Sequence, residues 1–234
     1  MKRGREMKYK DIELVWLGHS GFKLKSKEGI ICYIDPFKIF ENEERADKAD
    51  FILITHSHYD HCSVEDIKKI VKEGTIIVCT PDCLSKFRHI DYKVEIKTVM
   101  PGDRLEFKEG EVKIWAVMAY NTNKNFHTRE EDWVGFIIQL EDVSVYHAGD
   151  TDLIQEMKQI KATGIDIALL PIGGTYTMNA GEAAKAASLI KPGLAIPMHY
   201  ASIEGIGGKN EADLFLKYCS IEGVDVRILE VEKT

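Results

Sequence analysis

The chain has 234 residues, of which 44% are hydrophobic and 29% are charged, and its formal net charge is −7 at pH 7. A chain of this length buries roughly 70% of its unfolded surface, so a hydrophobic core can support the fold without disulfides. The excess of acidic residues argues against non-specific binding along a nucleic-acid backbone, which needs a basic face. No apolar run approaches the ~20 residues of a membrane helix, and the basic start leads into no signal peptide. We therefore expect a protein that neither spans a membrane nor is secreted.

The cysteines point to a reducing compartment. There are five, an odd number, and they are scattered along a chain without a recognisable secretory signal. This usage favours free thiols and a cytoplasmic location. Cys79 and Cys83 lack partners at zinc-finger spacing, so we expect them to be buried apolar residues, and we expect the same of Cys62.

The first half of the chain predicts mostly strands. Residues 1–7 are expected to be a flexible leader to a single domain that spans 1–234. Short apolar runs bounded by turn residues predict strands at 13–17, 22–24, 30–34, 51–54 and 75–79. Ser63, followed by two acidic residues, predicts a helix N-terminus that leads into residues 67–72. Residues 93–117 are expected to alternate short strands with turns at 101–103 and 108–110.

The second half predicts a hairpin and then alternating helices and strands. The hairpin joins residues 134–140 to 143–147 around Glu141 and Asp142. Helices are expected at 152–161, 180–190 and 210–218, and strands at 165–170, 194–197 and 224–231. Strands with helices distributed along the whole chain indicate an α/β domain with layered sheets and outer helices.

The most informative segment follows the expected strand 51–54. It reads Thr-His-Ser-His-Tyr-Asp-His over residues 55–61 and contains an HxHxDH motif, which arises by chance in roughly one of two thousand such chains. Side chains two residues apart point the same way in an extended segment, so His56 and His58 can bind one metal ion together. The turn that follows presents Asp60 and His61 towards a neighbouring position. Imidazole and carboxylate groups suit zinc and similar divalent ions.

This motif and its place after a buried strand resemble the metallo-β-lactamase superfamily of metal-dependent hydrolases. The resemblance covers essentially the whole chain and implies a four-layer αβ/βα sandwich. It extends to Asp150 in a Gly-Asp pair and to His199, which ends a late expected strand. The segments at residues 18–20, 35–36 and 171–175 are similar to the UlaG-like branch, which contains relatives of ascorbate-6-phosphate lactonase.

The resemblance also implies a ligand set for two divalent metal ions. His56 and His58 would bind the first ion, and Asp150 would bridge the two. Asp60, His61 and His199 would bind the second ion, and Asp60 would also be the catalytic residue that orients the attacking hydroxide. Zinc is the expected metal, with manganese, nickel or iron as alternatives, because nitrogen and oxygen ligands accept several such ions.

One position departs from the family pattern. The superfamily normally adds a third histidine to the first metal, from a strand end between the HxHxDH motif and the Gly-Asp pair. Here tyrosine, Tyr120, lies in or beside that position, and the nearest histidine is His127. The sequence leaves open which of the two residues completes the first site, or whether only one metal binds tightly.

The resemblance suggests a hydrolase that acts on a small phosphorylated ester, lactone or phosphodiester. The candidate substrate contacts are His19, Tyr120, Lys124 and Tyr176. The alternative is a non-catalytic metal-binding or RNA-associated protein that retains the fold, supported by the tyrosine in the third-histidine position. The expected partner is a small phosphorylated molecule. A homo-oligomer is also expected, whereas nucleic acid is not favoured and no membrane contact is expected.

Overall fold

The computed structural model describes residues 4–39 and 46–230. The chain divides into two compact units, one formed by Met1–Val99 with Glu230–Thr234 and the other by Met100–Leu229. Each unit is described by itself below. The expectation of a single domain over residues 1–234 stays a prediction.

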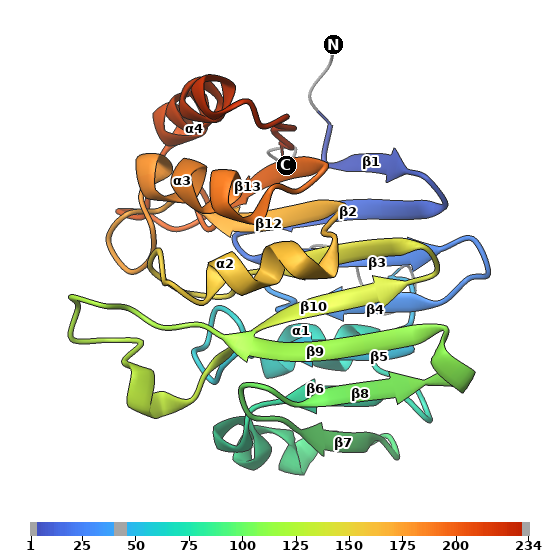
Figure 1. Ribbon diagram of the computed structural model, residues 1–234. Helices are drawn as coiled ribbons and strands as arrows, with labels where there is room; N and C mark the ends of the chain where they lie inside the picture. The colour runs from blue at the N-terminus through green and yellow to red at the C-terminus, as the bar shows by residue number, and fades with distance from the viewer. Residues whose placement is uncertain (1–3, 40–45, 231–234) are drawn as a thin grey trace. The chain divides into compact units, whose positions relative to one another are not determined.

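The first unit is built on a sheet with the strand order β1-β2-β3-β4-β5-β6-β7, which is seven-stranded within the described residues. The strands are β1 (Glu6–Tyr9), β2 (Ile12–Gly18), β3 (Gly21–Ser26), β4 (Ile31–Ile34), β5 (Phe51–Ile54), β6 (Ile76–Cys79) and β7 (Glu95–Thr98). From β1 to β4 neighbouring strands are antiparallel, and from β4 to β7 they are parallel (Figure 1). The expected leader is shorter than predicted, because Glu6 and Met7 pair with β2. Residues 1–3 lie outside the described part of the chain.

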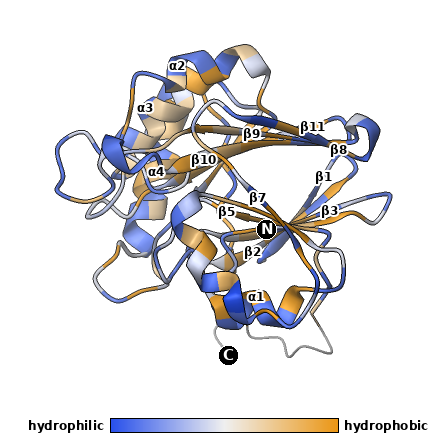
Figure 2. Ribbon diagram, turned by 90° about the horizontal axis from the view of Figure 1, so that it is seen from below, coloured by the Kyte–Doolittle hydropathy of each residue, from blue (hydrophilic) through white to orange (hydrophobic). Residues whose placement is uncertain are grey.

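One face of this sheet packs on helix α1 (Val64–Ile70) and on the 3₁₀ helix η1 (Pro81–His89). Ile52 and Ile77 of the sheet share a buried apolar cluster with Ile67 and Ile70 of α1 and with Phe87 of η1. Figure 2 shows that hydrophobic and hydrophilic residues alternate along α1, as expected of a helix with one buried face. The predicted helix start is confirmed, because the Ser63 hydroxyl caps α1 by accepting from the Asp66 amide at 3.3 Å.

The second unit contains a sheet with the order β13-β12-β11-β10-β9-β8, six-stranded over the described residues. Its strands are β8 (Arg104–Phe107), β9 (Val112–Met118), β10 (Val134–Leu140), β11 (Val143–His147), β12 (Ile167–Pro171) and β13 (Leu194–Met198). Neighbouring strands are antiparallel from β8 to β11 and parallel from β11 to β13. The predicted hairpin is confirmed, with Leu140 paired to Val143 around the two-residue turn.

Helices α2 (Met157–Ile160) and α3 (Ala180–Ile190) lie over one face of this second sheet, and α4 (Lys209–Glu222) packs on α3 (Figure 1). α3 has the predicted bounds and is capped by Asn179, whose side chain accepts from the amides of Gly181 and Glu182. The helix predicted at 152–161 was wrong over its first half. Asp152 does not start a helix there, because its carboxylate accepts from the Thr122 amide at 2.9 Å.

The strand predicted at 224–231 was also wrong. Among the described residues of that segment, only an isolated bridge joins Val226 to Ala195 of β13; Val231 lies outside the described part. α4 runs on to Glu222 and ends at Gly223, which has a φ of 71°. The segment pairs with β13 at Ala195 alone, whose amide donates to the Asp225 carbonyl at 2.8 Å and whose carbonyl accepts from the Arg227 amide at 3.0 Å, so no continuous ladder forms over residues 224–230.

Strand direction places the chemistry-bearing loops of each unit at one edge of its sheet. In the first unit, the parallel strands β4 and β5 lead directly into Asp35 and into the HxHxDH segment, and the β2–β3 turn at His19 lies at the same edge because Phe22 pairs with Ile34. In the second unit, the parallel strands β11 and β13 lead into the segments that carry Asp150 and His199. Carboxyl ends of parallel strands are where open α/β sheets place their sites.

Among the described residues, no helix combines the length and the apolar character that a membrane-spanning segment requires. The expectation of no membrane contact otherwise stays a prediction.

Asp66 gives a test of the first unit's packing. Its buried carboxylate accepts from the amides of Lys38 and Ile39, both at 2.9 Å, and from the Ser63 hydroxyl at 2.7 Å. We expect Asp66→Ala to lower the free energy of unfolding by about 2–4 kcal/mol, because two amides lose their acceptor. The matched control Glu65→Ala changes an exposed acid on the same helix and should stay within about 0.5 kcal/mol of the wild type. Equal effects of the two variants in urea denaturation would contradict the assignment.

Candidate functional site

The histidine-rich segment after β5 gathers three imidazoles in the first unit. The His56 and His61 rings have centroids 4.1 Å apart, and His56 Nε2 lies 3.1 Å from His58 Nδ1. His56 and His61 are buried, whereas His58 is exposed. The structure therefore brings together the three histidines of the motif, with one of them facing solvent.

Asp35 anchors this segment from the end of β4. Its fully buried carboxylate accepts from the Thr55 amide at 2.8 Å and from the Thr55 hydroxyl at 2.7 Å. The same carboxylate lies 2.7 Å from His61 Nδ1. One carboxylate thus holds both the first residue of the loop and the imidazole of its last histidine.

These contacts determine which nitrogen of each ring carries the proton and which has a lone pair available to bind a metal. A carboxylate only accepts hydrogen bonds, so His61 carries its proton on Nδ1 and leaves an Nε2 lone pair. The Thr55 hydroxyl gives its one proton to Asp35 and therefore accepts from His56 Nδ1, which lies 2.9 Å away. His56 then also presents an Nε2 lone pair. Neutral imidazoles in this tautomer are metal ligands.

Asp60 lies beside a second imidazole from another loop. His19 Nε2 is 2.9 Å from Asp60 Oδ2, and ligand atoms of His19, Asp60 and His61 all lie within 4.8 Å of one another. His19 is fully buried and its ring meets that of Phe37 edge-on at 5.9 Å. His19, a candidate substrate contact from sequence, therefore contacts the carboxylate expected to be catalytic.

In the second unit, two histidines approach Asp150. His199 Nε2 lies 3.0 Å and His127 Nε2 lies 3.6 Å from the same oxygen, Asp150 Oδ2. All three side chains are at least 95% buried. The loop between β9 and β10 thus folds back far enough to bring His127 to Asp150.

The His127 ring is oriented by backbone. Its Nδ1 lies 3.1 Å from the Tyr176 carbonyl oxygen, an acceptor, so this nitrogen carries the proton and Nε2 faces Asp150. The Asn121 side chain steadies both segments, because its amide donates to the carbonyls of Tyr176 at 2.8 Å and of Phe126 at 3.0 Å. A protein acceptor therefore sets the tautomer here as it does for His61.

Several of these residues adopt a left-handed backbone. The φ angles are 53° for His19, 44° for Asp35, 55° for His127 and 57° for His199. Such conformations are uncommon outside glycine and cost on the order of 1–3 kcal/mol each. Gly173 also makes close contact, since a Cβ there would lie 2.6 Å from the His199 carbonyl oxygen. The fold holds these side chains in place at a local energetic cost, as is common at functional sites.

The donor set of each unit fits a divalent cation. The first unit offers imidazole nitrogens with one carboxylate, and the second offers two imidazoles around Asp150. An imidazole lone pair and a carboxylate oxygen repel each other at 3–4 Å unless a proton or a cation lies between them. Nitrogen and oxygen ligands without thiolate suit zinc, manganese, nickel and iron, and a cation held this way polarises substrate and water.

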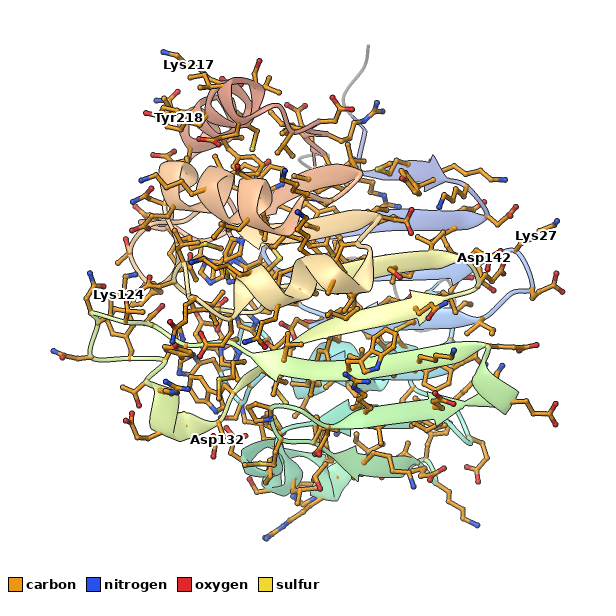
Figure 3. All side chains as sticks on the ribbon, viewed as in Figure 1. Lys27, Lys124, Asp132, Asp142, Lys217 and Tyr218 are labelled. Atoms are coloured by element: carbon orange, nitrogen blue, oxygen red, sulfur yellow. The ribbon has the colours of Figure 1, made fainter. Side chains whose placement is uncertain are left out.

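Three predicted substrate contacts are engaged within the second unit. The Tyr120 hydroxyl donates to the Glu156 carboxylate at 3.1 Å, and burial with this hydrogen bond raises the pKa of Tyr120. Lys124, on the loop between β9 and β10 (Figure 3), pairs with the buried carboxylate of Asp152. The Tyr176 carbonyl accepts from His127 Nδ1, while the residue as a whole is 40% exposed. Their roles as substrate contacts stay predictions.

The sequence reasoning missed several of the residues that orient the ligands. Asp35 entered only as part of a family-like segment, and Thr55 and Asn121 were given no role. The sequence did carry a signal for Asp35 as a site residue. It directly follows an apolar strand, and His56 likewise lies just beyond the end of an apolar strand. The sequence reasoning also gave no role to Tyr59, an aromatic residue of the motif. Tyr59 is 66% exposed and meets Phe37 edge-on at 5.9 Å.

The cysteines are buried, as predicted for Cys62, Cys79 and Cys83, and all five are free thiols. Hydrogen bonds from Cys62 and Cys79 lower the pKa of Cys83, and the same bonds raise the pKa values of the two donors. Over the described residues, the side-chain groups that could hold a metal ion are made of histidine and aspartate. Cys62, Cys79 and Cys83 are therefore part of the buried apolar cluster that the first sheet shares with α1 and η1.

Comparison with known proteins places these features in a family. The model of a beta-lactamase superfamily domain matches residues 13–199. A UPF0173 metal-dependent hydrolase from Thermoplasma acidophilum is 34% identical over 228 residues, which cover 95% of this chain and 97% of that protein. Another from Pyrococcus furiosus is 36% identical over 198 residues, covering 81% and 84% of the two chains.

Solved structures agree. A protein from Parabacteroides distasonis, described as a metal-dependent hydrolase, superimposes with a TM-score of 0.80 at 31% identity and covers 99% of this chain and 100% of its own. Igni18, a metallo hydrolase from Ignicoccus hospitalis, gives a TM-score of 0.77 at 25% identity, with 95% and 96% covered. The predicted α/β metallo-β-lactamase fold is confirmed. The chain belongs to the metallo-β-lactamase superfamily and, within it, to the UPF0173 family of metal-dependent hydrolases.

Proposed function

We propose that this metal-dependent hydrolase acts on a small phosphorylated ester, lactone or phosphodiester and that it uses two divalent cations, of which zinc is the expected kind. His56, His58 and His127 would hold the first ion. Asp60, His61 and His199 would hold the second ion, and Asp150 would bridge the two. The family membership supports metal-dependent hydrolysis, whereas the ligand assignment, the number of ions and the substrate class are proposals.

The observation that carries the proposal is the fixed tautomer of the imidazoles in both units. Asp35 takes the Nδ1 proton of His61 and, through Thr55, sets that of His56. The Tyr176 carbonyl does the same for His127. Without any side-chain rearrangement, His61 Nε2 thus lies 3.9 Å from Asp60 and His127 Nε2 lies 3.6 Å from Asp150, while His56 Nε2 lies 3.1 Å from His58 Nδ1, as a preformed cation site requires.

When bound, a pair of divalent cations would lower the pKa of water towards about 7 and polarise the scissile carbonyl or phosphoryl group. Asp60 would orient the attacking water, because its carboxylate is only slightly exposed and accepts at two oxygens. His19 would keep Asp60 in place through the 2.9 Å contact between Nε2 and Oδ2. Tyr59, exposed beside these residues, offers a surface for the apolar part of a substrate.

His127 is the better supported third ligand of the first ion. Its Nε2 approaches Asp150 at 3.6 Å, whereas the Tyr120 hydroxyl donates to Glu156. The tyrosine had been the main reason to consider a non-catalytic protein. With a histidine available beside Asp150, that alternative loses its sequence argument.

The substrate class rests on the similarity to the UlaG-like branch. A phosphate contact from Lys124 would have to compete with Asp152, and one from the fully buried His19 with Asp60, so Tyr176, which is exposed, is the better candidate for contacting substrate. The homo-oligomer and the cytoplasmic location are predictions that accompany this proposal.

Metal content and substrate class can be tested together. We expect about two zinc ions per chain by elemental analysis of protein purified without added metal, as a di-metal site requires. We expect hydrolysis of bis-p-nitrophenyl phosphate or of a simple lactone, lost on chelation and restored by Zn, Mn or Ni. One ion or fewer per chain, with neither substrate cleaved after metal is restored, would contradict the proposed function.

Asp60 is expected to be essential for turnover but not for folding. Asp60→Ala should lower kcat/KM by about 10³-fold or more, equivalent to about 4 kcal/mol of transition-state stabilisation. Far-ultraviolet circular dichroism should remain unchanged. Asp91→Ala, which removes an exposed carboxylate of the same unit, is the matched control and should keep wild-type activity. Near-normal turnover by metal-loaded Asp60→Ala protein would remove Asp60 from the catalytic role.

Asp35 is expected to act through the ligands that it orients. Asp35→Asn should weaken metal affinity by about 10–100-fold, because an amide cannot accept from Thr55 and His61 as a carboxylate does. The measurement is competition with a coloured chelator. Asp50→Asn, at the opposite end of β5, removes a carboxylate that accepts from Ile31 and Lys72 and should leave metal affinity unchanged. Wild-type affinity in a folded Asp35→Asn protein would refute this role.

A further inference from the structure

A cavity of about 490 Å³ lies within the second unit, away from the residues that bring imidazole to Asp150. Its apolar wall comes from β9, α2 and the segment before α2, and its charged groups come from β8 and from Glu156, the residue before α2. The apolar side chains include Trp115, Val117, Met118, Ile154, Met157 and Ile160. Cavities of roughly 300–1,000 Å³ with mostly apolar walls and a few polar groups are typical of small-molecule sites.

The cavity exists because the outer face of β9 is not covered by a full helix. Trp115 and Val117 alternate with the buried residues Ile114 and Ala116, so their side chains lie on the outer face of the sheet. α2 has only four residues, and in Figure 1 it lies in front of the sheet near β11 and β10, while β9 and β8 have no helix of the described residues in front of them in this view. A helix of the predicted length would have covered more of the face.

Two charged residues of opposite sign, Arg104 and Glu156, line the cavity. Arg104 of β8 pairs in register with Trp115, so its side chain lies next to the indole on the same face. Arg104 is exposed, and no ion pair found among residues 4–39 and 46–230 includes it. Glu156, in contrast, already accepts from Tyr120 and lies 3.3 Å from the Arg129 guanidinium. Arg104 is therefore the charged residue of the cavity that can bind a charged group of a ligand.

We infer that this cavity binds a small amphipathic carboxylic acid, with its apolar chain or ring against Trp115 and Val117 and its carboxylate on Arg104. A guanidinium binds a carboxylate through paired hydrogen bonds. The apolar wall gives affinity in proportion to the buried chain. The site is independent of the metal ligands, so the inference does not rest on the proposed hydrolytic function.

Octanoate is the probe, and binding is measured by titration calorimetry on the metal-loaded full chain. We expect saturable 1:1 binding of octanoate, much weaker binding of acetate, which lacks the chain, and much weaker binding of 1-octanol, which lacks the charge. Acetate also serves to detect binding at the metal ions. A metal ion would bind the carboxylate of acetate as tightly as the carboxylate of octanoate. Equal binding of acetate and octanoate would overturn the inference.

Variants locate the site. Arg104→Gln should weaken octanoate binding by about 10-fold, equivalent to about 1.4 kcal/mol, and Val117→Trp should abolish it by filling the cavity. Arg88→Gln, which changes an exposed arginine of the first unit, is the matched control and should bind like the wild type. Octanoate should also change the tryptophan fluorescence of the wild type. Trp115→Phe should keep the binding heat but lose this change in fluorescence.

The inference is overturned if octanoate binds no more tightly than about 1 mM, or if Arg104→Gln binds it as the wild type does. Thermal denaturation checks that each variant folds. Should Val117→Trp fail to fold, Arg104→Gln and Trp115→Phe still decide the question, because both change side chains that are at least partly exposed.

Discussion

The buried carboxylate of Asp35 is the contact on which the first half of the candidate metal site depends. It accepts from the Thr55 amide, the Thr55 hydroxyl and His61 Nδ1, all within 2.8 Å. Burial of a carboxylate is costly unless such donors surround it. The same hydrogen bonds fix Thr55 at the start of the HxHxDH loop and the His61 ring at its end. The Asp35 carboxylate thus offsets the cost of its own burial, holds the loop conformation and sets the tautomer of a ligand.

In the second unit a histidine is also oriented by a hydrogen-bond acceptor, but the acceptor is a backbone carbonyl and not a carboxylate. There a backbone carbonyl, that of Tyr176, takes the Nδ1 proton of His127, and Asn121 ties that carbonyl to the His127 loop. His199 is held against Gly173, where a larger residue would collide with its backbone. In both units an acceptor behind the ring directs Nε2 outward. The left-handed backbone of these residues is consistent with surroundings that hold them firmly.

Local pattern was a good guide wherever local physics decides the structure. The apolar run of β5, the serine cap of α1 and the alanine-rich α3 all formed as predicted, because burial on both faces, capping and helix propensity act over a few residues. The failures occurred where a distant partner intervened. Asp152 looked like the start of a helix, but its carboxylate serves Thr122 and Lys124, thirty and twenty-eight residues earlier in the chain. The basic leader gave no strand signal, yet β1 forms by pairing with β2.

The sequence by itself determined the kinds of ligand and their spacing: His56, His58, Asp60 and His61 in one short segment, with Asp150 and His199 after later strands. Spacing within a segment is a local property, and residues at strand ends share an edge by strand direction alone. Only the tertiary structure decided that His127 rather than the Tyr120 hydroxyl lies against Asp150, that Asp35 orients two histidines, and that Lys124 is neutralised by Asp152. Those contacts join residues at least twenty positions apart, and their formation depends on how loops fold back, which no local pattern encodes.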